Sequence, residues 1–114
     1  MPDRLLLFPI LAILLAAAPA SAEDQALVNK GMQLFTAQKC SMCHSVAGKG
    51  NPKGSLDNVD AARSADEIRQ WLTNPEQMRE KTHAERKPAM KSFASLPKGD
   101  VDALVAYIQT LKKK

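Results

Sequence analysis

The chain has 114 residues, and a chain of this length is expected to form one domain with a modest hydrophobic core. Its formal net charge of +4 comes largely from lysine and is too small to indicate a nucleic-acid-binding protein. Short motifs, and not a strongly charged surface, therefore carry the information about function.

Residues 1–22 have the composition of a secretory signal peptide. Arg4 supplies a positive charge near the N-terminus, residues 5–18 form an apolar run, and Ala20-Ser21-Ala22 matches a cleavage site. The alternative is an uncleaved membrane anchor, although the run is shorter than the ~20 residues that a span requires. We expect cleavage after residue 22, export to the periplasm, and no stable membrane insertion of the domain formed by residues 23–114.

Residues 24–38 are predicted to form an amphipathic helix, because Leu27, Gly31 and Phe35 recur every four positions. Glycine within a helix costs about 1 kcal/mol relative to alanine. Gly31 therefore predicts a point at which another helix approaches closely.

The next stretch, Cys40-Ser41-Met42-Cys43-His44, contains both cysteines of the chain. The spacing C-x-x-C-H is typical of covalent attachment of a c-type haem. Residues three apart in a helical turn share a face, so both thiols can reach the same porphyrin edge. His44 follows directly and is placed to bind the haem iron as its proximal ligand.

Three other uses of two cysteines are less consistent with the sequence than haem attachment. A structural zinc site needs four ligands, and only His83 remains as a further soft ligand. A thioredoxin-like dithiol is expected near a βαβ pattern, and no strand pattern is evident. A disulfide across two intervening residues closes too small a loop to stabilise the chain much.

A glycine- and proline-rich loop is predicted after His44, between residues 48 and 54. A ligating histidine usually donates its other ring N–H to a carboxylate or a backbone carbonyl. We expect the acceptor for His44 among the carbonyls between Pro52 and Ser55.

Three further segments complete the predicted elements. Ser64 and Glu67 form a capping box that starts a helix ending near residue 73. Asn74 as N-cap and Pro75 at the first position predict a second short helix. Residues 82–97 predict a long loop that carries Met90, and residues 98–112 predict a closing amphipathic helix. The total is three or four helices and no confident strand.

This order of features resembles a small bacterial class I cytochrome c. Besides the haem motif, Pro88-x-Met90 lies in a late loop, and Gly31 and Phe35 match the first-helix glycine and aromatic residue of that family. Leu104 and Tyr107 match its last-helix pair. The resemblance implies an all-α fold of three to four helices wrapped around one covalently bound haem c, with the N- and C-terminal helices crossing. The chain departs from the family at residue 55, where serine replaces the usual proline.

The distal iron ligand is assigned to Met90, because methionine and histidine together are the cytochrome c pattern. Met78 and His83 are the alternatives, and Met32 and Met42 lie too close to the attachment site. Trp71 is either a donor to a haem propionate, as the resemblance suggests, or a core aromatic residue.

The function expected from these features is that of a periplasmic electron carrier and not an enzyme. A haem module with an open iron site for gas binding, or a subunit or domain of a redox enzyme complex, is the alternative. Lysines that flank the haem motif and Met90 form either a basic ring that steers an acidic redox partner or an ordinary solvated surface; they are Lys39, Lys49, Lys53, Lys87 and Lys91.

Overall fold

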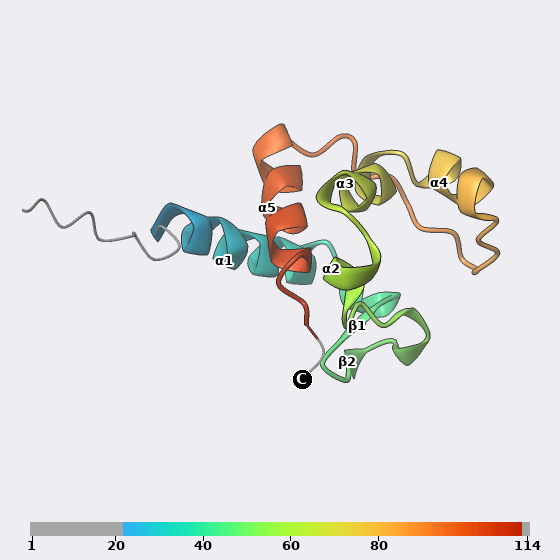
Figure 1. The fold of residues 1–114 in the computed structure, drawn as a ribbon, viewed down its shortest axis with the longest axis horizontal. Coiled ribbons are helices and arrows are strands. Elements are labelled where there is room, and N and C mark those ends of the chain that lie inside the picture. The colour runs from blue at the N-terminus through green and yellow to red at the C-terminus, as the bar shows by residue number, and fades with distance from the viewer. Residues whose placement is uncertain (1–21, 113–114) are drawn as a thin grey trace, which may run out of the picture.

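The computed structural model describes residues 22–112, and the predicted signal peptide lies outside these residues except for Ala22. Five α-helices occur in this range (Figure 1): α1 (Ala22–Ala37), α2 (Val59–Ala62), α3 (Ala65–Thr73), α4 (Pro75–Thr82) and α5 (Lys98–Ile108). The predicted all-α class is confirmed, and four of the helices are those expected, with α2 a single additional turn. None of the helices among the described residues is long and apolar enough to cross a membrane.

A short antiparallel hairpin, which the sequence did not predict, joins β1 (Ser45–Val46) to β2 (Lys49–Gly50). Its two-residue turn places Ala47 at φ 51° and Gly48 at φ 80°. Positive φ at both turn residues matches the twist of paired strands. The Ala47 N–H also donates to Asp57 Oδ1 at 2.9 Å, so the hairpin is fixed to the segment that follows it.

Helices α1 and α5 cross and pack directly against each other (Figure 1). A Cβ atom on Gly31 would overlap the carbonyl oxygen of Ala103 and lie 2.6 Å from Tyr107 Cβ. Phe35 and Tyr107 meet edge to face, with ring centroids 5.6 Å apart. The predicted close approach at Gly31 is confirmed, because the backbone of α5 occupies the space that a side chain at residue 31 would need.

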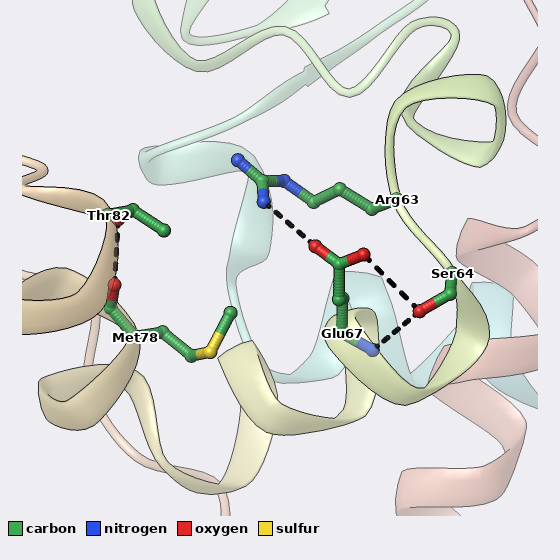
Figure 2. Close-up of polar contacts among 5 residues, drawn as sticks. All are labelled: Arg63, Ser64, Glu67, Met78 and Thr82. Atoms are coloured by element: carbon green, nitrogen blue, oxygen red, sulfur yellow. Dashed lines mark hydrogen bonds and ion pairs between the residues drawn. The ribbon is translucent and has the colours of Figure 1, made fainter.

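The start of α3 has the N-cap bond of the predicted capping box, while the Glu67 carboxylate contacts the Ser64 hydroxyl and not its backbone N–H. Ser64 Oγ accepts the Glu67 backbone N–H at 3.2 Å and lies 3.4 Å from Glu67 Oε1 (Figure 2). The same Glu67 side chain pairs with Arg63 at 3.4 Å. At α4 the prediction is only partly right: Pro75 occupies the first helical position, but Asn74 makes no side-chain capping bond.

The hydrophobic core lies among α1, α3, α5 and the segment around Phe93. Its buried members are Phe35, Ile68, Leu72, Phe93, Val101, Leu104, Val105, Ile108 and Leu111. Five of them, Phe35, Ile68, Leu72, Phe93 and Ile108, also line a cavity. One side of the core therefore forms the apolar wall of the candidate site.

Candidate functional site

The attachment segment, residues Cys40–His44, begins as a 3-10 turn that two residues separate from the end of α1. Lys39 precedes this turn in the left-handed conformation, with φ 57°. The backbone N–H groups of Cys43 and His44 both donate to the Cys40 carbonyl, at 3.1 and 2.9 Å. The turn gives both half-buried cysteines, which are free thiols, access to the same cavity. Burial raises the pKa of the Cys40 thiol, so the thiol form is favoured at neutral pH.

Asn51 holds the attachment segment in shape, a role that the sequence analysis missed. Its backbone N–H lies 3.1 Å from the carbonyl oxygens of both Ser41 and His44. Its side-chain Nδ2 donates to the Met42 carbonyl at 3.2 Å, and its Oδ1 accepts the Lys53 N–H at 3.0 Å. An asparagine before a proline is a known turn signal, and this was the clue available in the sequence.

The imidazole of His44 is oriented by a backbone carbonyl. Nδ1 lies 2.9 Å from the oxygen of Gly54, so Nδ1–H is the donor and Nε2 keeps its lone pair. The predicted acceptor range of residues 52 to 55 is therefore confirmed, and the serine at residue 55 does not prevent the bond. Burial lowers the pKa of His44, the Gly54 carbonyl opposes this effect, and the positive Arg86 adds to it. The neutral imidazole is the form that binds metals.

A cavity of about 780 Å³ brings the predicted site residues together. Cys40, Cys43, His44 and Met90 all line it, and Met90 is partly buried against the core. This volume is within the range of pockets that bind small molecules and cofactors.

The rival ligands are placed elsewhere in the described chain. Met78 is 3% exposed in α4 and does not line the cavity. His83 is an exposed residue at the C-terminal end of α4 and also lies outside the lining. Met32 is 50% exposed on α1, away from the cavity. Among residues 22–112 no three His, Cys, Asp or Glu side chains form a metal-binding group.

Trp71 presents an unpaired polar atom at the cavity. Its indole Nε1 is buried and has no hydrogen-bond partner among the described residues. The Arg63 guanidinium lies 5.6 Å from the centroid of the Trp71 ring, and both residues line the cavity. A buried donor without an acceptor is costly. An acidic group on a molecule in this cavity would satisfy the indole N–H and face the Arg63 charge.

Met90 lies in a loop, residues 83–97, that is fixed to α3 and α4 at several points. Arg79 Nη1 in α4 lies 3.4 Å from the Met90 carbonyl oxygen. On the far side of Met90, the Phe93 N–H donates to the Leu72 carbonyl at 2.7 Å, and Ser92 Oγ donates to the Thr73 carbonyl at 3.1 Å. These bonds hold the backbone of the Met90 loop beside the cavity.

Comparison with known proteins defines the class. Residues 28–112 match the family model described as "Cytochrome c", and the chain therefore belongs to the cytochrome c family. That family implies a covalently bound haem c and electron transfer. The residues present fit such a group, since two thiols, an oriented imidazole, an apolar wall and an unpaired indole donor face one cavity.

A curated relative is similar over most of this chain. It is cytochrome c oxidase subunit 2 of Alkalihalophilus pseudofirmus, 24% identical over 110 residues. The match covers 84% of this chain and 29% of that protein, so the chain spans less than a third of the relative's length. No solved structure matches the chain.

Proposed function

We propose that this chain is a periplasmic electron carrier in which one haem c is joined to Cys40 and Cys43. His44 would be the proximal iron ligand and Met90 the distal one. The observation that supports this most directly is that all four side chains line one cavity of about 780 Å³. Residues 1–22 would direct export and be removed, leaving residues 23–114 as the haem domain.

The protein side chains have distinct tasks in this proposal. When bound, the haem iron supplies one-electron redox chemistry. The Gly54 carbonyl fixes the imidazole of His44 so that Nε2 is the free ligand atom. The thioether of Met90 favours the reduced metal and raises the potential relative to two histidines. The apolar wall excludes water, which also tunes the potential.

The part of the cavity beside Trp71 and Arg63 would hold the acidic groups of the cofactor. Trp71 Nε1 is a buried donor without a partner, and Arg63 supplies a positive charge beside it. Two propionates are the acidic groups that a haem would bring to this place. They would give the indole N–H an acceptor and partly neutralise the arginine.

The expected partners are redox proteins with an acidic docking surface. The five lysines that flank the haem motif and Met90 are all exposed, and Lys39 and Lys91 lie at the cavity. A positive ring around the route of electron exit would speed the encounter with an acidic partner.

A role inside a redox enzyme complex is the second candidate. The similarity to an oxidase subunit over 84% of this chain favours it. Such a role predicts that the protein is recovered from its source in a stable assembly. A free carrier would instead elute at the size of the single domain.

The test is to produce the full chain with a working haem-ligation system and to assay the purified protein. A pyridine haemochrome assay should report covalent haem, and the oxidised protein should show a methionine-to-iron absorption band. Met90→Ala should remove this band and lower the potential. Met32→Ala is the matched control, since Met32 is half exposed and away from the cavity, and it should change neither.

Three results would each contradict a different part of the proposal. A colourless protein would exclude haem attachment altogether. A haem protein that binds carbon monoxide avidly in its native state would have an open iron site, and the carrier role would be wrong. An unchanged spectrum in Met90→Ala would refute only the assignment of the distal ligand.

A further inference from the structure

The carbonyl groups of the attachment segment are all hydrogen-bonded, but one of them differs from the rest. The Cys40 carbonyl accepts two N–H groups of its own turn, and the next two carbonyls and that of His44 accept from Asn51. The Cys43 carbonyl accepts instead from Arg86 Nη2 at 2.5 Å. Arg86 is the only donor to this carbonyl among the described residues, and it comes from the Met90 loop.

The Arg86 guanidinium can approach the attachment segment closely because Gly54, which lies beside it, has no side chain. A Cβ atom on Gly54 would overlap both the Arg86 guanidinium and the Cys43 carbonyl oxygen. The same Gly54 offers its own carbonyl to His44 at 2.9 Å. One guanidinium therefore contacts the residue that precedes His44 and the residue that orients it.

Arg86 also places a positive charge at this position. It lines the cavity together with Cys43 and His44 and is an exposed residue. A fixed positive charge disfavours the ferric state, which carries one more positive charge than the ferrous state. The charge should therefore raise the reduction potential, with an effect reduced by screening from solvent.

Resting on the proposed function, we propose that Arg86 is a positioning residue that joins the Met90 loop to the attachment segment and raises the reduction potential of the bound haem. The hydrogen bond to Cys43 connects the segment that bears the proximal ligand to the loop that bears the distal one. Its guanidinium has two roles, which can be separated: a directed donor, and a charge.

The test compares three variants of the haem-loaded protein. Arg86→Gln removes the charge, and Arg86→Lys keeps the charge but replaces the planar fork by a single ammonium. Lys87→Gln is the matched control for readouts that involve no redox partner, because it removes the same charge one residue away at an exposed side chain with no hydrogen bond or ion pair among the described residues. The readouts are the reduction potential and the denaturant concentration at which the methionine-to-iron band is lost.

Arg86→Gln should raise the ferric-to-ferrous ratio at the wild-type midpoint potential on the order of threefold, whereas Arg86→Lys should leave it nearly unchanged. Both Arg86 variants should lose the methionine-to-iron band at lower denaturant than the wild type, and Lys87→Gln should not. The inference is overturned if Arg86→Gln and Lys87→Gln behave alike in both measurements. Absence of haem from the wild type would refute the proposed function itself, so the two failures are distinguishable.

Discussion

Replacing Gly31 by alanine is the sharpest test of the α1–α5 crossing. The added methyl group would overlap the Ala103 carbonyl oxygen and lie 2.6 Å from Tyr107 Cβ. Overpacking of this kind typically costs about 1–3 kcal/mol, and a backbone obstacle favours the upper end. Alanine returns about 1 kcal/mol of helix propensity. We therefore expect a net loss of roughly 2 kcal/mol, or about 8–16 °C in Tm for a domain of this size.

Gly99→Ala is the matched control, since Gly99 is also helical. A Cβ atom there has only Lys30 Nζ nearby, at 3.9 Å. This variant should match the wild type or gain up to about 1 kcal/mol in stability. Thermal unfolding of the haem-loaded proteins, followed by far-UV circular dichroism, measures both changes. Equal melting temperatures for Gly31→Ala and Gly99→Ala would show that the two helices do not meet at Gly31.

Three other perturbations have expected outcomes. Trp71→Phe should reduce the change in reduction potential that accompanies propionate titration and leave the methionine-to-iron band intact. Reduction potentials measured at a series of pH values test this. If the pH dependence matched that of the wild type, Trp71 would be a core residue only. Gly54→Ala should displace the backbone beside His44 and lower the denaturant concentration at which the methionine-to-iron band is lost, whereas an unchanged concentration would contradict the close contact. Hydrogen bonds from Lys98 and Arg69 lower the pKa of Asp102, so the stability that this carboxylate contributes is present above its unfolded pKa and is lost as pH falls through the lowered folded value. Asp102→Asn should accordingly reduce the loss of stability in acid, as measured by denaturant unfolding at a series of pH values.

The features that sequence reasoning predicted correctly each have a local signal in the sequence. The N-cap bond between Ser64 and Glu67 is formed within one turn of helix, and the structure has it. Gly31 is conspicuous because glycine weakens a helix, and that cost is what indicated a neighbouring helix. The acceptor for His44 was restricted to a few carbonyls because a ligating histidine usually donates its second ring N–H to a nearby oxygen. The Gly54 carbonyl is the one that His44 uses.

The features that were missed depend on contacts between distant segments, on strands too short to show a pattern, or on the hydrogen bonds that end a helix. Nothing near Arg86 indicates a bond to Cys43, 43 residues away. The hairpin was missed because two-residue strands are too short to show alternation. Helix α5 ends at Ile108 and not at residue 112, and the N–H groups of Thr110 and Leu111 donate to carbonyls three residues back rather than four. The Thr110 hydroxyl donates to the same Tyr107 carbonyl as its N–H.

The bonds made by Asn51 define the smallest portable form of the attachment motif. The pentapeptide transplanted alone into another scaffold would carry its thiols and imidazole, but most of its carbonyls would lose their donors. A graft of residues 40–54 would bring Asn51, the hairpin and the Gly54 acceptor along with it. For protein engineers, the unit of transfer is therefore a folded loop three times the length of the recognisable signature.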